Sequence, residues 1–209
     1  VVLIGNNEEV NKLLEKNNIN LGDTTIINPE KSEKIEAYAN TLYELRKAKG
    51  MTEEQAKELI LNPVYFGMMM VKLEEADGLV SGAAHSTADT LRPALQIIKT
   101  KPGTKLVSAF VAIDVPNCEF GENGLFFFGD CGLNQNPNSE ELAEIAISTA
   151  KSFENLVGEK AKVAMLSYST MGSAKAEEVT KVQDAIKMAK EKAPELMLDG
   201  EMQLDAAIV

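Results

Sequence analysis

The chain has 209 residues and a formal net charge of −11, with 44% hydrophobic and 25% charged residues. This composition is typical of a globular domain protein, and the length allows one large core or two modest ones. The acidic balance argues against a nucleic-acid partner, which needs a basic face, and no apolar run approaches the ~18 residues of a membrane span.

Cysteine usage and the N-terminus indicate the compartment. Cys118 and Cys131 are too far apart for a CxxC pair, and no histidine cluster accompanies them, so neither a disulfide nor a metal site is expected. The first residues lack the basic leader of a signal peptide. We therefore expect a cytoplasmic protein with no membrane partner. Because the chain opens in mid-strand without Met, we also expect sequence to be missing upstream.

The first half of the chain alternates short strands with helices. Strands are predicted at residues 1–4 and 24–27, and a long helix at about 32–49. Cap signals predict the starts of three more helices, at Asn6, Thr52 and Asn62. The run 78–80 is predicted to be a short buried strand, followed by a loop of small residues and a helix that reaches Ile98.

The connector 99–103 contains Pro102-Gly103 and marks a domain boundary. It separates a first α/β domain, 1–102, from a second, 103–209, each expected to be incomplete at its outer end. Strands in the second domain are predicted at 105–115, 125–128, 162–166, 196–198 and 206–209, with helices capped by Asn138 and following residue 173. The first two strands could form a hairpin. The alternation otherwise predicts an α/β fold with mainly parallel sheets.

The stretch 76–93 has the pattern of an oxyanion site. Ser81 and Gly82 open its loop, and Ser86 or Thr87 stands where a helix N-cap belongs. A strand, a loop of small residues and a helix N-terminus direct free backbone N–H groups and the helix dipole into one turn. We predict that this loop binds a phosphate or another oxyanion.

A second loop, 167–173, repeats the pattern of strand, hydroxyl-rich loop and helix. Its candidate substrate-binding residues are Ser167, Ser169, Thr170 and Gly172. Ligands of open α/β sheets bind beyond the carboxyl ends of strands, at such turns. Because the two loops fall on different predicted domains, we expect an interdomain cleft.

Arginine is rare in this chain, and its positions are informative. Arg46 and Arg92 are the two arginines among 21 basic residues. The guanidinium fork suits bidentate contact with phosphate or carboxylate, whereas lysine serves general solubility. A bias toward lysine would explain the rarity, but not why Arg92 follows the small-residue loop. For Arg46, stabilisation of a helix C-terminus is an equally good reading.

Other reactive side chains carry weaker signals. His85 is the single histidine and lies in the first loop, where it serves either as a base or as a backbone hydrogen-bond partner. Cys131 follows a strand, with no basic partner near it in sequence. Neither GxGxxG nor a Walker loop is present, so nicotinamide or ATP binding has no motif behind it.

The stretch ADGLVSGAAHSTADTLRPALQIIK, residues 76–99, closely resembles the signature of phosphate acetyltransferases (phosphotransacetylases). The resemblance extends over the chain through residues 45–52, 130–131, 167–175 and 199–207. It implies acetyl transfer between coenzyme A and inorganic phosphate, with coenzyme A as substrate and no permanent cofactor. It also implies a homodimer whose two α/β domains resemble those of isocitrate and isopropylmalate dehydrogenases.

The resemblance also implies roles for individual residues. Arg46 and Arg92 match the family's two functional arginines, which implies coenzyme A binding and catalysis, with Arg92 as the catalytic residue. The family's Ser-Arg pair and its basic aspartate are expected beyond residue 209. The alternatives are a non-catalytic module that binds coenzyme A or a phosphoester, a butyryl-transferring relative, and a metal- and NAD-dependent dehydrogenase of the same fold.

Overall fold

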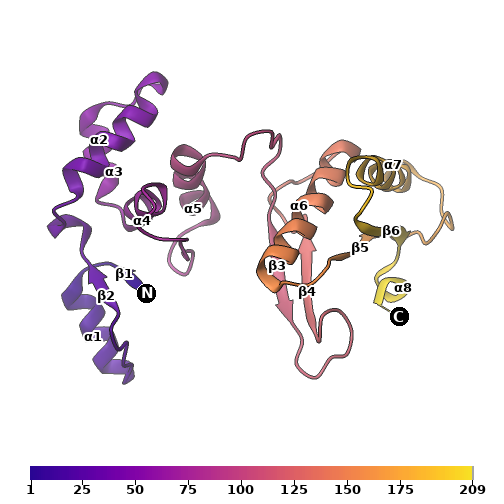
Figure 1. Ribbon diagram of the computed structural model, residues 1–209, viewed down its shortest axis with the longest axis horizontal. Coiled ribbons are helices and arrows are strands. Elements are labelled where there is room, and N and C mark those ends of the chain that lie inside the picture. Colours follow the sequence, from indigo (N-terminus) through magenta and orange to yellow (C-terminus); the bar gives the residue numbers. More distant parts are fainter. Residues whose placement is uncertain (209) are drawn as a thin grey trace. The chain divides into compact units, whose positions relative to one another are not determined.

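The computed structural model describes residues 1–208 (Figure 1). The chain divides into two compact units, Val1–Pro102 and a second that begins at Gly103. Helices pack on short strands in both units, which confirms the predicted mixed α/β class. Among the described residues, β-strands form three two-stranded sheets, two of them parallel and one antiparallel.

The first unit follows the predicted order of helices closely. Its elements are β1 (Val2–Ile4), α1 (Asn7–Asn17), β2 (Thr25–Ile27), the 3₁₀ turn η1 (Pro29–Lys31), α2 (Ile35–Arg46), the 3₁₀ turn η2 (Lys47–Lys49), α3 (Glu53–Ile60), α4 (Pro63–Lys72), α5 (Thr87–Pro93) and the π-helical turn η3 (Ala94–Ile98). Strands β1 and β2 are parallel. Side chains cap the helices where the sequence predicts it, at Asn6, Thr52 and Asn62.

Helix α4 forms the buried centre of the first unit. It contacts α5 as well as α2 and α3 (Figure 1). Residues 64–70 are all buried, including the three methionines, and the Phe66 ring lies 4.9 Å from that of Tyr38. Gly67 lets two other chain segments approach the helix, because a Cβ there would lie 2.8 Å from Leu79 Cδ1 and 2.9 Å from Ile4 Cδ1.

The predicted strand at 78–80 is wrong. This segment is extended but irregular; Leu79 packs into the core, whereas the Val80 side chain is 100% exposed. The predicted burial is therefore wrong as well, except at Leu79. A strand also needs a neighbour for its backbone N–H and C=O groups, and none of the described residues pairs with this segment.

Glu75 links α2 to the turn after α4, and this link makes the first unit sensitive to acid. Lys34 and the Tyr38 hydroxyl both donate to its carboxylate, and these bonds lower the pKa of Glu75. A carboxyl group with a lowered folded-state pKa stabilises the fold above its unfolded pKa of about 4.3 and loses that effect as pH falls through the folded pKa. We expect the difference in melting temperature between wild type and Glu75→Gln to shrink between about pH 5 and pH 3. The exposed neighbour Glu74, changed to Gln, should show no such trend.

The second unit contains β3 (Phe110–Asp114), β4 (Leu125–Gly129), α6 (Ser139–Val157), β5 (Lys162–Leu166), α7 (Glu177–Lys192), β6 (Met197–Met202) and α8 (Leu204–Ile208). Strands β3 and β4 form the predicted hairpin, and β5 pairs in parallel with β6. Helices α6 and α7 pack against each other and cover these strands (Figure 1). The core between them contains Ala143, Ala185, Ala189 and Leu198.

Three boundaries in the second unit differ from prediction. The strand predicted at 196–198 is β6, which continues to Met202. Of the strand expected at 105–115, only β3 is regular. Phe110 pairs with Gly129, the last residue of β4, so the residues before Phe110 have no partner in β4. The segment predicted as a strand at 206–209 lies in helix α8, apart from Val209, which is outside the described residues. Ala206 and Ala207 favour a helix, which outweighs the short apolar run.

The capping box of α6 is complete, as the sequence predicts. The Asn138 side chain accepts the Glu141 N–H at 3.0 Å, and the Glu141 carboxylate accepts the Asn138 N–H at 2.9 Å. We expect Asn138→Ala to lower the free energy of unfolding by about 0.5–2 kcal/mol, because it leaves a helix N–H without its acceptor. Denaturant unfolding measures this, with the exposed Gln135→Ala as a control that should change little.

Candidate functional site

The first loop, residues 81–86, leads into α5. Ser81 and Gly82 are exposed, and Thr87 is the first residue of the helix. Ser86 is the N-cap: its hydroxyl accepts the Asp89 N–H at 3.2 Å and donates to Asp89 Oδ2 at 2.7 Å. The bond from Ser86 is the main cause of the lowered pKa of Asp89, and nearby Arg92 and His85 add to it. His85 therefore lies close to a carboxylate in this loop.

The structure brings Arg46 and Arg92 together around one tyrosine. Burial raises the pKa of Tyr65, and the positive charges of both Arg92 and Arg46 act in the opposite direction, so both guanidinium groups lie within electrostatic reach of the Tyr65 hydroxyl. That hydroxyl donates to Gln96 Oε1 at 3.0 Å. Two arginines separated by about half of the first unit's sequence thus both act electrostatically on one side chain of α4.

Arg46 has an unused hydrogen-bond donor at this place. Its Nε is buried and has no hydrogen-bond partner among the described residues, whereas Arg92 is exposed. A buried donor without an acceptor costs free energy. The arrangement of two guanidinium groups beside a tyrosine is suited to binding a phosphate or carboxylate.

Sequence reasoning missed Tyr65 and Gln96. Tyr65 belongs to an apolar run that was read only as core, and its side chain is indeed 7% exposed. A tyrosine in such a run is a usable signal, because a buried tyrosine hydroxyl nearly always has a hydrogen-bond partner. Gln96 carried no comparable signal.

The second loop, 167–173, is held by a dense set of hydrogen bonds. Ser169 is fully buried; its hydroxyl donates to Glu201 Oε1 at 2.9 Å and accepts the Ala174 N–H at 3.1 Å. The Gly172 N–H also donates to Glu201 Oε1, at 2.7 Å. The Thr170 hydroxyl accepts the N–H of Gln203 at 3.0 Å.

Ser167 and Thr170 remain half-buried in this loop, whereas Gly172 is exposed. The Ser167 hydroxyl accepts the Ser169 N–H at 3.1 Å. The residue that holds the loop, Glu201, was not singled out from the sequence. It is 3% exposed and follows Asp199, which pairs at the surface with Lys190 at 3.7 Å.

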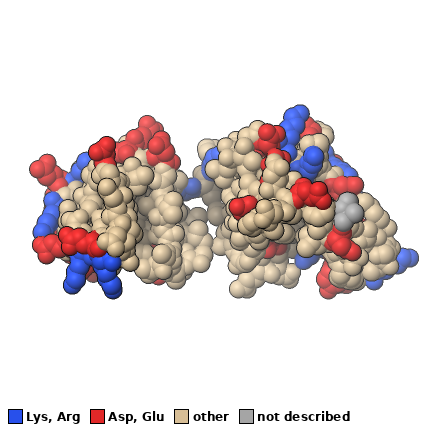
Figure 2. All heavy atoms as spheres, turned by 90° about the horizontal axis from the view of Figure 1, so that it is seen from below, with Lys and Arg blue, Asp and Glu red and all other residues tan. Residues whose placement is uncertain are grey.

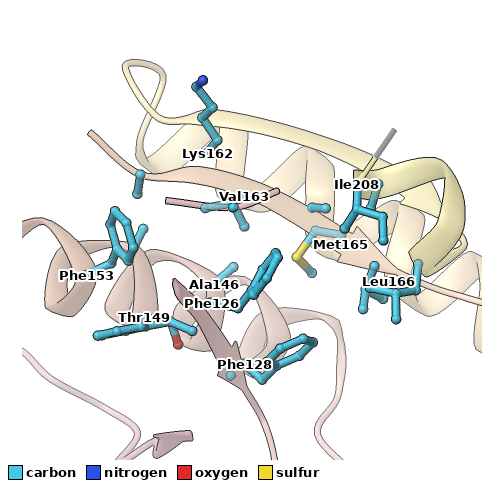
Figure 3. A pocket seen from close by; sticks show the side chains of 18 of the residues that line it. Phe126, Phe128, Ala146, Thr149, Phe153, Lys162, Val163, Met165, Leu166 and Ile208 are labelled. Carbon is cyan, nitrogen blue, oxygen red and sulfur yellow. The ribbon is translucent and has the colours of Figure 1, made fainter. Parts of the chain in front are cut away.

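A cavity of about 640 Å³ lies in the second unit, and Leu166, the residue before the 167–173 loop, is among the residues that line it. Phe126 and Phe128 of β4, Thr149 of α6, and Met165 and Leu166 of β5 surround it (Figure 3). Successive side chains of a strand point to opposite faces of its sheet, so a cavity on one face would be lined by every second residue. Here consecutive residues of both strands line the cavity. The cavity therefore borders the edges of β4 and β5 that carry no partner strand among the described residues. The Thr149 hydroxyl is buried there without a hydrogen-bond partner in the described part.

Cys131 and Asp130 follow β4. The Cys131 thiol is exposed and donates to the Phe128 carbonyl at 2.9 Å. Burial raises the pKa of Asp130, and the positive charge of Lys181 acts against this rise. The thiol has no imidazole or ammonium partner among the described residues, so nothing there makes it a strong nucleophile.

Three further observations on the described residues concern metal binding, membrane spanning and surface charge. Residues 1–208 contain no group of three or more His, Cys, Asp or Glu side chains arranged to hold a metal ion. None of their helices is both long and apolar enough to cross a membrane. Acidic and basic side chains intermix on the face that Figure 2 shows.

Comparison with known proteins agrees with the sequence pattern. The family model described as "Phosphate acetyl/butaryl transferase" matches residues 1–209. A phosphate acetyltransferase of Acetivibrio thermocellus is 61% identical over the whole chain, and one of Thermoanaerobacterium thermosaccharolyticum is 54% identical. The chain spans 62% of the length of the first relative and 63% of the second.

Solved structures agree as well. The phosphotransacetylase EutD of Staphylococcus aureus superposes with a TM-score of 0.84 at 47% identity, covering all of this chain and 62% of that one. A phosphotransacetylase of Streptococcus pyogenes gives a TM-score of 0.82 at 44% identity, covering 99% of this chain and 61% of that one. On this match over its whole length, the chain belongs to the phosphate acetyl/butaryl transferase family.

Proposed function

We propose that the full-length protein is a phosphate acetyltransferase, which interconverts acetyl-CoA plus phosphate and acetyl phosphate plus coenzyme A. The observation that carries the proposal is that the charges of Arg46 and Arg92 both act on Tyr65, against the burial that raises its pKa, and that the buried Arg46 Nε has no hydrogen-bond partner among the described residues. Family membership and the names of the relatives support the same reaction.

The reaction needs positioning and charge stabilisation more than a covalent enzyme intermediate. In one direction the thiolate sulfur of coenzyme A attacks the acetyl carbonyl of acetyl phosphate, and a C–S bond forms. The C–O bond to phosphate then breaks, and phosphate leaves with the electron pair. The thiol proton passes to a base, which the family resemblance places beyond residue 209. Holding two anionic reactants together at the required distance lowers the activation barrier, because binding has already supplied the entropy cost of bringing them together.

In this proposal the residues of the first unit bind the anionic groups. Arg92 stabilises charge at the reacting phosphate, and Arg46 binds substrate through its free Nε. The exposed loop residues Ser81 and Gly82 and the α5 start at Ser86 and Thr87 line the same substrate region. The Ser86 hydroxyl is shared with Asp89, so its contribution would be to shape the loop.

In the second unit we propose substrate-binding roles for residues of the 167–173 loop. Ser167 and Thr170 contact substrate from the 167–173 loop, and Ser169 and Gly172 contribute to it. We further propose that 1–102 and 103–209 are two α/β domains of the kind found in isocitrate and isopropylmalate dehydrogenases. The enzyme would be a cytoplasmic homodimer that uses coenzyme A as a substrate and needs no permanent cofactor.

A thiol-release assay tests the reaction. The purified full-length protein should release coenzyme A from acetyl-CoA only when phosphate is present, and acetyl phosphate should form in equal amount. The 209-residue chain, assayed beside it, should show no such release, because the base lies elsewhere in this proposal. Absence of phosphate-dependent release from the full-length protein would contradict the proposal.

Butyryl transfer is the second candidate, because the family description includes it. Each methylene in an apolar pocket discriminates by only about 1–3 kcal/mol, so the same arginines could serve either acyl group. Comparing kcat/KM for acetyl-, propionyl- and butyryl-CoA decides between the two. The names of the relatives favour the highest value for acetyl-CoA.

A further inference from the structure

We propose that Glu201 is a positioning residue that holds the 167–173 loop in the shape that binds substrate. This inference rests on the proposed function, because it assigns the loop to the same reaction. Glu201 lies in β6, and the loop follows β5, the parallel partner of that strand. The carboxylate thus reaches the loop from the neighbouring strand.

The contacts of Glu201 converge on one oxygen. Its Oε1 accepts the Ser169 hydroxyl at 2.9 Å and the Gly172 N–H at 2.7 Å. The backbone of β6 holds the same loop, because the Glu201 carbonyl accepts the Met171 N–H at 2.9 Å. The three donors belong to residues on both sides of Thr170. The side chain and the backbone carbonyl of Glu201 together therefore hold the curvature of the loop.

The charge of Glu201 makes this arrangement unusual for a purely structural residue. Its carboxylate is buried without an ion pair to any described lysine or arginine. The Gly172 N–H is the largest cause of its lowered pKa, and Gln183 and Ser169 also contribute. A buried charge held only by hydrogen-bond donors requires those donors to stay in place. The loop and the carboxylate therefore constrain each other.

The consequence concerns Ser167 and Thr170, the half-buried hydroxyls of the loop. Ser167 bonds to the N–H of Ser169, the residue whose hydroxyl Glu201 holds. Thr170 lies between Ser169 and the backbone bond at Met171. Removing the carboxylate leaves the Ser169 hydroxyl and the Gly172 N–H, on either side of Thr170, without their acceptor. The hydroxyls of Ser167 and Thr170 then lose their fixed positions.

Steady-state kinetics of the full-length enzyme test the proposal. Glu201→Ala should raise the KM of acetyl-CoA or phosphate by about tenfold or more, because charged hydrogen bonds to two donors are lost. Glu201→Gln keeps an oxygen that can accept both donors, so it should restore that KM to within about threefold of wild type. Glu195→Gln removes an exposed carboxylate just before β6 and should leave both KM values unchanged.

The outcomes separate positioning from simple stability. A lower melting temperature with unchanged KM values in Glu201→Ala would overturn the proposal, since a structural role alone reduces the folded fraction and not substrate affinity. If Glu201→Ala does not fold, Ser169→Ala removes one donor and should raise the same KM. Wild-type KM values in that variant would then refute the inference. If the wild-type enzyme shows no phosphate-dependent thiol release, the result rejects the proposed function instead.

Discussion

Arg92→Lys in the full-length enzyme should lower kcat/KM for phosphate-dependent thiol release by about 10²–10³-fold, the effect of removing a group that stabilises transition-state charge. Lysine keeps the positive charge but loses the planar fork that binds two oxygens at once. The fold should survive, because Arg92 is exposed and makes no ion pair with any described residue.

Circular dichroism and melting temperature verify that the Arg92→Lys protein is folded, and the thiol-release assay measures the loss. Lys101→Gln serves as the matched control, since it removes one exposed cation from the same unit. Its turnover should stay at the wild-type level. Near-normal turnover in Arg92→Lys would remove Arg92 from the catalytic site.

Gly124→Ala should lower the free energy of unfolding by about 2–5 kcal/mol, the largest stability effect we expect from a single methyl group in this chain. Gly124 lies in the turn of the β3–β4 hairpin at φ +94°, and a Cβ there would lie 2.3 Å from the Val115 carbonyl oxygen. That carbonyl belongs to backbone and has little room to move, because the Val115 N–H donates to the Gly124 carbonyl at 2.9 Å.

Gly158→Ala separates the two causes of this loss. Gly158 ends α6 at φ +84°, but nothing lies within 4 Å of its would-be Cβ. The Gly158→Ala variant should lose only about 1–2 kcal/mol of its free energy of unfolding, the cost of a left-handed backbone at a residue with a Cβ. Denaturant unfolding of both variants measures the difference. Equal losses would show that the contact with Val115 relaxes at little cost.

Local signals in the sequence predicted local structure well. The caps at Thr52, Asn62 and Asn138 were located correctly because each depends on residues within three positions of it. The strand at 78–80 was wrong because a strand depends on a partner elsewhere in the chain. The hairpin of β3 and β4 succeeded because its partners are consecutive along the chain.

The residues of the candidate site also differ in whether a signal close to them in the sequence could identify them. The rarity of arginine, the position of Arg92 after the small-residue loop and the family resemblance singled out Arg46 and Arg92. The structure adds that the charges of both act on Tyr65. Glu201 could not be found in this way. It lies beyond the strand predicted at 196–198, and its carboxylate is held by donors from a loop about thirty residues earlier in the chain. Only the pairing of β5 with β6 brings the two segments together.

The cavity beside β4 and β5 bears on how the 209-residue polypeptide would behave when produced by itself. Two strand edges that pair with no strand among residues 1–208 border this cavity, and Leu166, which lines it, is 41% exposed. Such edges are templates on which another polypeptide adds a strand. Preparations of the isolated chain would therefore self-associate as concentration rises, and kosmotropic salts would promote it. Dilute, low-salt handling follows directly from this architecture.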